Sequence, residues 1–173
     1  MNKKEFQKLL NENGYDFKVK DNKIIINHQG YVNLRSLTTL PEGVEFNNQG
    51  FVDLDNLTTL PEGVEFNNRD NVYLESLIGK HNYRGKLLEF KHIDGYTMII
   101  ESTKKSGDFT IMKSRYFKGG EISDMPKCWI ASRGDYFAHG KTMKQAIEDV
   151  NFKYLQATLD VTELVESIKK TTH

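Results

Sequence analysis

The first half of the chain repeats its order of apolar and polar positions every 20 residues. Residues 31–50 and 51–70 are identical at fourteen of twenty positions, and the pattern extends weakly back to residue 17 and forward to residue 77. Within each repeat, apolar and polar residues alternate over two short stretches, which is typical of β-strands with one buried face. The residues Pro-Glu-Gly before the second stretch and Asn-Asn after it favour turns. A period of 20 residues is too short for a pair of helices, so the repeat predicts stacked β-strands.

The stacking of these repeats predicts a short β-solenoid over residues 1–79. Equivalent apolar side chains would form columns that fill its core. These columns are Val32/Val52/Val72, Leu34/Leu54/Leu74, Leu37/Leu57/Leu77 and Ile26/Phe46/Phe66. Each coil of a solenoid buries its apolar face only against its neighbours, so the ends need caps. Residues 2–13 have the spacing of an amphipathic helix that begins with a capping-box pair, Asn2 and Glu5, and this helix would cap the first coil.

One motif within the repeat resembles a known family. The segment LTTLPEGV, at 37–44 and again at 57–64, resembles bacterial leucine-rich repeats of the 20-residue LxxLPxxL type. The resemblance implies a solenoid that binds other proteins through the face formed by its strands. It does not imply catalysis.

The second half of the chain alternates apolar and polar residues over longer stretches, as antiparallel strands do. The candidate strands are 87–93, 96–102, 108–116, 128–132 and 136–138. Asp94-Gly95 is a signal for a tight hairpin. A helix is predicted from Thr142, which is followed by apolar residues three and four positions apart, and a last helix is predicted from Asp160.

The two halves are separated by a stretch without apolar periodicity. Residues 80–86 are rich in basic residues and include a glycine, which predicts a linker. The predicted domains are therefore a capped β-solenoid repeat domain at 1–79, the linker at 80–86 and an α+β domain at 87–173. The predicted fold class is α+β: a short N-terminal β-solenoid capped by a helix, followed by an antiparallel sheet with one or two C-terminal helices.

The end of the chain carries a second resemblance. The stretch from Cys128 to Lys153 resembles, in outline, the small sheet-and-helix domain of HicB-type antitoxins. The segment YFAHGKTMKQAIEDVNFKYL within it resembles proteins encoded by phages and mobile elements of gut bacteria. These likenesses imply either an antitoxin-type regulator or a small protein of a mobile element.

Composition excludes several classes of protein. Lysine plus arginine and aspartate plus glutamate both number 24, so the overall charge attracts neither nucleic acid nor an anionic membrane. The apolar runs are too short for a membrane helix, and the N-terminus lacks the apolar region of a signal peptide, so we expect a cytoplasmic protein. Cys128 is the single cysteine, and no spacing of histidines is typical of a metal or cofactor site. His139 lacks an evident base or orienting partner, so we expect no enzymatic activity.

The charges are unevenly distributed along the chain. Residues 31–79 contain eight acidic and two basic residues, whereas residues 80–173 contain twelve acidic and sixteen basic ones. Acidic and aromatic side chains recur at outward positions of the repeat and are candidate contacts for a partner with a basic surface. These candidates are Glu42, Glu45, Asp53, Asp55, Glu62, Glu65, Tyr31, Phe51 and Tyr73. The other interpretation of the acidic positions is a solvated face that prevents aggregation of strand edges.

Two functional hypotheses follow. The first is a non-enzymatic protein-binding module of a phage or mobile element, which inhibits a bacterial host defence protein in the manner of an anti-CRISPR protein. Its acidic solenoid face would dock on a basic surface, such as that of a nucleic-acid-binding nuclease. The second is a HicB-like antitoxin or nucleic-acid-binding regulator that uses a basic cluster of the C-terminal domain. The basic candidates are Lys104, Lys105, Lys113, Arg115 and Lys118.

Overall fold

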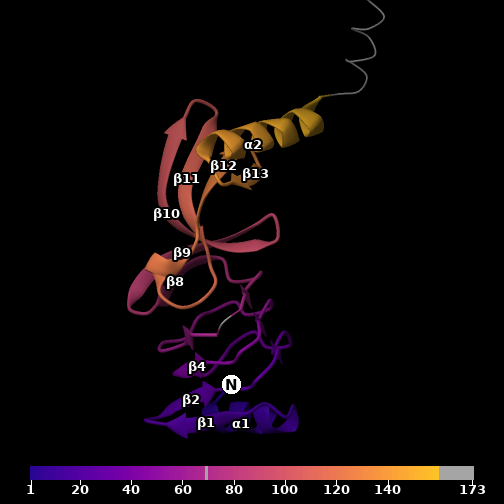
Figure 1. Ribbon diagram of the computed structural model, residues 1–173. Helices are drawn as coiled ribbons and strands as arrows, with labels where there is room; N and C mark the ends of the chain where they lie inside the picture. Colours follow the sequence, from indigo (N-terminus) through magenta and orange to yellow (C-terminus); the bar gives the residue numbers. More distant parts are fainter. Residues whose placement is uncertain (69, 160–173) are drawn as a thin grey trace, which may run out of the picture. The chain divides into compact units, whose positions relative to one another are not determined.

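The computed structural model describes residues 1–68 and 70–159, which divide into two compact units (Figure 1). The first unit comprises Met1–Glu101 and Ser114–Lys127, and the second comprises Ser102–Lys113 and the described residues from Cys128 onward. The chain therefore passes between the units after Glu101, after Lys113 and after Lys127. None of these three points lies in the predicted linker at 80–86. The helix predicted from Asp160 lies outside the described residues.

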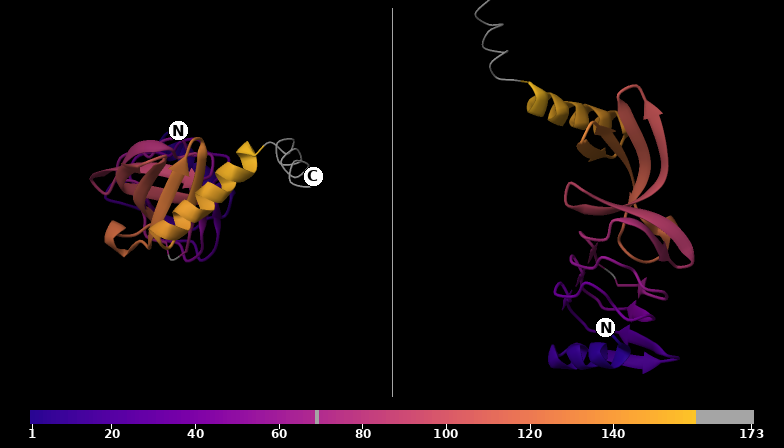
Figure 2. Two further views of the ribbon diagram at one scale, coloured as in Figure 1. Left: turned by 90° about the horizontal axis from the view of Figure 1, so that it is seen from above. Right: turned by 180° about the vertical axis from the view of Figure 1, so that it is seen from behind.

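The first unit begins with the predicted helix α1 (Lys3–Glu12), which has the expected capping box. The side chain of Asn2 accepts a hydrogen bond from the backbone N–H of Glu5, and the Glu5 carboxylate accepts one from the N–H of Asn2. Phe6 and Leu10 are fully buried on its inner face. In Figures 1 and 2, α1 lies across the first end of the repeat, beside the strands that follow it.

The repeat forms two sheets of very short strands. One is a four-stranded sheet of order β1-β2-β4-β6, with β1 (Phe17–Lys20), β2 (Lys23–Ile26), β4 (Val44–Phe46) and β6 (Glu65–Phe66). The other is a parallel sheet of order β3-β5-β7, with β3 (Val32–Asn33), β5 (Val52–Asp53) and β7 (Val72–Tyr73). Residues 20 positions apart pair, as Val32 with Val52 and Phe46 with Phe66, so the expected stacking register is confirmed.

The prediction of a β-solenoid was wrong. The N-terminal region consists of two separate sheets, not a closed solenoid, and the first of them is mixed, because β1 pairs antiparallel with β2 in a hairpin. Asp21 and Asn22 form the hairpin turn in left-handed backbone conformations. The turns at each Pro-Glu-Gly segment limit regular pairing to two or three residues per repeat, so neither sheet continues around into the other.

The two sheets share one apolar core. The four predicted columns are buried, with Val32, Val52, Phe46 and Phe66 fully shielded from solvent. The repeats approach so closely at the turns that a β-carbon on Gly50 would lie 2.8 Å from the carbonyl carbon of Gly30. Glycine is therefore required there by backbone packing.

The strands after the repeat form a six-stranded sheet of order β13-β12-β11-β10-β9-β8. Its strands are β8 (Gly79–Tyr83), β9 (Lys86–Ile93), β10 (Tyr96–Ser106), β11 (Phe109–Tyr116), β12 (Lys127–Arg133) and β13 (Tyr136–Gly140), with a 3-10 turn at Ile122–Asp124. The hairpin expected at Asp94-Gly95 is present between β9 and β10, and a second hairpin joins β12 and β13. The segment predicted as a linker, 80–86, instead lies in the β8–β9 hairpin. Its polar composition concealed a strand because β8 buries only Tyr83.

The second unit has its own small core. Helix α2 (Met143–Thr158) begins where expected, with the Thr142 hydroxyl accepting a hydrogen bond from the N–H of Gln145. Ala131, Ala138, Ala146 and Val150 are buried between α2 and strands β12 and β13. No helix among residues 1–68 and 70–159 is long and apolar enough to cross a membrane.

Candidate functional site

The three aromatic residues predicted as contacts lie together beside the β3-β5-β7 sheet. The ring centroids of Tyr31 and Phe51 are 4.1 Å apart, and those of Phe51 and Tyr73 are 5.6 Å apart. Tyr31 and Tyr73 are 38% and 40% exposed, which is high for rings held in a stack. We call these three residues the aromatic ladder. Tyr31 and Phe51 are equivalent positions of successive repeats, 20 residues apart. The equivalent residue of the third repeat is Asn71, so Tyr73 belongs to the ladder without being part of this series.

Asp53, which was predicted to contact a partner, instead forms a hydrogen bond with Tyr31 of the ladder. It is only 8% exposed, and its carboxylate accepts hydrogen bonds from the Tyr31 hydroxyl (3.2 Å) and from the backbone N–H of Asp55 (3.1 Å). Arg35 pairs with Asp55 at 3.4 Å. Partial burial, and secondarily the neighbouring Asp53 carboxylate, raise the pKa of Tyr31. Asp53 therefore acts within the fold, and Asp55 is the carboxylate of this pair with more of its side chain exposed.

The acidic pair on the other sheet is engaged internally. Glu45 and Glu65 are directly opposite each other, as expected from the repeat. Lys23 lies 3.7 Å from each carboxylate and Arg84 lies 3.6 Å from Glu65, so the repulsion between the two like charges is compensated. The remaining acidic candidates, Glu42 and Glu62, are exposed at turns. Glu45 and Glu65 are thus poorly placed as free contacts for a partner.

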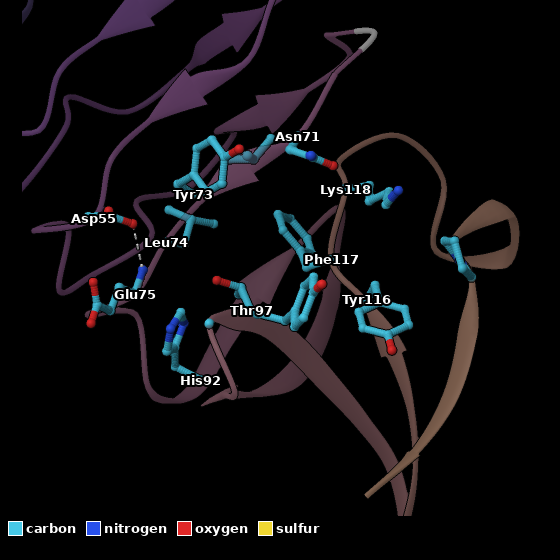
Figure 3. A pocket seen from close by; sticks show the side chains of 14 residues that line it. Asp55, Asn71, Tyr73, Leu74, Glu75, His92, Thr97, Tyr116, Phe117 and Lys118 are labelled. Atoms are coloured by element: carbon cyan, nitrogen blue, oxygen red, sulfur yellow. Dashed lines mark hydrogen bonds between the residues drawn. The ribbon is translucent and has the colours of Figure 1, made fainter. Parts of the chain in front are cut away.

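A pocket of about 660 Å³ lies next to the aromatic ladder, entirely within the first unit (Figure 3). Its walls come from β7, the β9–β10 hairpin and the segment after β11. Four aromatic residues contribute to it: Tyr73, Tyr96, Tyr116 and Phe117. The rings of Tyr96 and Tyr116 meet edge to face with centroids 5.2 Å apart. The pocket thus combines a size typical of ligand sites, roughly 300–1,000 Å³, with aromatic walls.

The charged residues of the pocket lie at its two sides. Figure 3 shows Asp55 and Glu75 on one side and Lys118 on the other, with Phe117 between them. The Asp55 carboxylate accepts a hydrogen bond of 3.2 Å from the backbone N–H of Glu75. Nδ1 of His92, also in the lining, is buried and has no hydrogen-bond partner within the described part of the chain. The acidic side suits a cationic group, because carboxylates and aromatic faces both attract cations.

The edge strand of the other sheet, β6, is covered by Tyr83 and by the segment that contains Phe117 and Gly120. The hydroxyl of Tyr83 donates to the carbonyl oxygens of Gly120 (3.1 Å) and Phe66 (3.4 Å), and its ring packs against Phe117. Burial raises the pKa of Tyr83, although Arg84 opposes this effect. Burial alone would lower the pKa of Arg84, but Tyr83 and the carboxylates of Glu121 and Glu65 raise it above its usual value.

The basic candidates are not one cluster. Lys104 and Lys105 are exposed on β10, and the ammonium group of Lys113 lies 5.7 Å from the ring centroid of Trp129. Arg115 binds Glu101 and the carbonyl oxygens of Ser123 and Met125, so its guanidinium serves the fold. Lys118 lines the pocket. Lys104, Lys105 and Lys113 belong to the second unit, and Arg115 and Lys118 to the first.

Metal ligands are not grouped in the described ranges: no set of three or more His, Cys, Asp or Glu side chains there could hold an ion. Cys128 is buried as a free thiol. Comparison of the chain with protein-family models, curated proteins and solved structures found no match.

Most of the pocket was missed by sequence reasoning. Its residues come from β7, from the β9–β10 hairpin and from residues 116–118, which the predicted domain boundary had assigned to different halves. A usable signal was the run of aromatics at Tyr116 and Phe117, which break the apolar-polar alternation at the end of a strand. Only the return of this segment to the repeat brings these side chains together.

Proposed function

We propose that the chain is a non-enzymatic protein-binding module that uses the aromatic ladder and the acidic residues around it. The observation that carries the proposal is the stack in which half-buried Phe51 contacts the exposed rings of Tyr31 and Tyr73, with the carboxylates of Asp55 and Glu75 nearby. Exposed tyrosines at a rigid surface supply large contact areas at low entropic cost, and aromatic residues are enriched at interfaces. A partner covering this ladder would bury apolar surface that the chain itself leaves in water.

The free acidic residues of the repeat favour a basic partner. Glu42, Glu62 and Glu75 are exposed and form no ion pair with any residue in 1–68 or 70–159. Their summed field would attract a basic surface and raise the rate of association. The nucleic-acid channel of a host defence nuclease is a basic surface of this kind. We therefore favour a function in which the chain inhibits such a nuclease by occupying its channel.

Affinity capture from a nuclease-treated bacterial lysate tests the proposal. The wild type is compared with the double variant Tyr31→Ser/Phe51→Ser, which removes part of the ladder outside the pocket, and with Lys104→Glu/Lys105→Glu as the matched control on the second unit. Thermal melting first establishes that each variant is folded. We expect a stoichiometric protein to be retained by the wild type and the lysine control but not by the ladder variant.

Two results would refute the proposal. Retention of the same protein by the ladder variant, with loss from the lysine variant, would move binding to the second unit. Capture of nucleic acid alone from an untreated lysate, lost on Lys104→Glu/Lys105→Glu, would favour the regulator hypothesis, and its affinity would fall steeply with salt.

A further inference from the structure

We propose that the pocket is a strand-docking site, in which an extended basic segment of a partner protein pairs with the open edge of β7. The proposal rests on the proposed function, because it names the part of the partner that is bound. It assigns to the site a binding mode, addition of a strand to a sheet edge, and a sequence preference for the ligand.

The open edge is visible in the hydrogen bonds of the repeat. The N–H groups of Val32 and Leu34 donate to the carbonyl oxygens of Phe51 and Asp53, at 3.1 and 2.9 Å. One repeat later, Val52 and Leu54 donate in the same way to Asn71 and Tyr73, at 3.0 and 2.9 Å. Each repeat therefore uses the next one as its acceptor.

The third repeat has no successor in this sheet. β7 is the last strand of the order β3-β5-β7, and no residue in 1–68 or 70–159 accepts a hydrogen bond from the N–H of Val72 or Leu74. Leu74 is fully buried and Val72 is 3% exposed, so solvent reaches these groups poorly. Backbone donors in such places are nearly always paired in proteins.

The pocket begins where the missing strand would lie. Residues 71–75, which are β7 and its flanks, all line it. Five consecutive residues on one wall make that wall a strand edge. A partner segment paired along residues 72–75 would have four extended residues and span about 13 Å, since a strand rises about 3.3 Å per residue.

The lining also predicts the side chains of the ligand. In the register of the repeat, alternate residues of the added strand would lie over Val72 and Leu74, and the others over Tyr73 and Glu75. Apolar side chains suit the first pair. Arginine or lysine suits the second, because Tyr73 offers a ring face and Glu75 a carboxylate. Lys118 lies across the pocket from Glu75, so basic residues are expected only toward the Glu75 end.

The test uses the full chain and the synthetic peptide acetyl-Ser-Val-Arg-Leu-Arg-amide, whose arginines would fall over Tyr73 and Glu75. Titration followed by NMR should shift the amide signals of Val72 and Leu74 and slow their hydrogen exchange. The peptide with both arginines changed to glutamate should not bind. Binding of both peptides alike, or shifts elsewhere without any at Val72 and Leu74, would overturn the proposal.

Backbone pairing is tested separately from charge. A methyl group on the amide nitrogen of the first arginine blocks a hydrogen bond to the Val72 carbonyl, whereas one on the leucine nitrogen faces away from β7. We expect the first to abolish binding and the second to leave most of it. Equal effects of the two methyl groups would show attraction by charge alone and would refute strand addition.

Two protein variants complete the test. Glu75→Arg should weaken peptide binding at least about tenfold, whereas Asp149→Arg, an equal charge change on helix α2 of the second unit, should change it by less than about twofold. Both positions are exposed, so melting temperatures should stay near that of the wild type. Equal weakening would overturn the proposal. The two proposals can fail separately. If the peptide binds at β7 but capture of a partner does not depend on the aromatic ladder, the proposed function is refuted and the strand-docking site is retained.

Discussion

The two sheets of the repeat end in opposite ways. On the β2-β4-β6 side, the last strand is covered: the carbonyl oxygen of Phe66 accepts hydrogen bonds from the N–H of Gly120 and the hydroxyl of Tyr83, and its ring packs against Tyr83 and Phe117. On the β3-β5-β7 side, the last strand faces a pocket. Exposed strand edges invite pairing with other chains, and proteins usually cover them. Covering one edge and leaving its neighbour open is what a strand-binding site requires.

The largest expected difference between the two edges is in stability. Phe66→Ala should lower the free energy of unfolding by about 3–5 kcal/mol, because it removes a fully buried ring from the covered edge. Tyr73→Ala, at the open edge, should cost less than about 1 kcal/mol, since this ring is 40% exposed. Urea denaturation of both variants measures the contrast. Similar losses would mean that the β7 edge is as much a part of the core as the β6 edge.

A smaller effect is expected from the loop that covers β6. A β-carbon on Gly119 would lie 2.8 Å from the Phe66 β-carbon and 2.9 Å from its carbonyl oxygen, whereas one on Gly120 would have no atom within 4 Å. Both glycines have a left-handed backbone, so alanine costs about 1 kcal/mol at either. Gly119→Ala should cost about 1–3 kcal/mol more, from overpacking.

The melting temperatures of these two adjacent variants report that difference, with Gly120→Ala as the matched control. Equal melting temperatures of the two variants would mean that the loop does not pack tightly on Phe66. The β6 edge would then be less well covered than the structure shows.

The smallest effect concerns pH. Tyr83→Phe should cost about 1 kcal/mol near neutral pH, because the carbonyl oxygens of Phe66 and Gly120 lose a hydrogen-bond donor. Burial raises the pKa of Tyr83, so its phenol stays neutral when the unfolded tyrosine ionises at about pH 10. The stability that this shift contributes is complete below about pH 10 and is lost as the pH rises toward the raised value.

The difference in unfolding free energy between wild type and Tyr83→Phe should therefore shrink above about pH 10. Urea denaturation at several pH values measures it. A difference that stays constant through this range would mean that the hydroxyl is solvated and that the β6 edge is not sealed from water.

Sequence reasoning was most successful where structure depends on local spacing. The capping box at Asn2 and Glu5, the cap of α2 at Thr142 and the hairpin at Asp94-Gly95 each depend on residues within a few positions of one another. It failed at β8, where polar residues form a strand because a neighbour, β9, is available to pair with them. It also failed in joining the repeat into a solenoid, because the strands of each repeat proved too short to continue from one sheet to the other.

For the candidate site, the sequence by itself determined the stacking of Phe51 on Tyr31 and of Glu65 on Glu45, because a 20-residue repeat imposes a register on parallel strands. Tyr73 lies outside that register, so its contact with Phe51 depends on the folded structure. Only the tertiary structure decided which acidic residues remain available. Lys23 and Arg84 neutralise Glu45 and Glu65, and Asp53 is buried under Tyr31, whereas Glu75 stays exposed at the pocket. These pairings join residues up to some 40 positions apart, and no local pattern encodes which distant cation approaches which carboxylate. The open edge of β7 was decided in the same way, by where the later strands return to cover the repeat and where they do not.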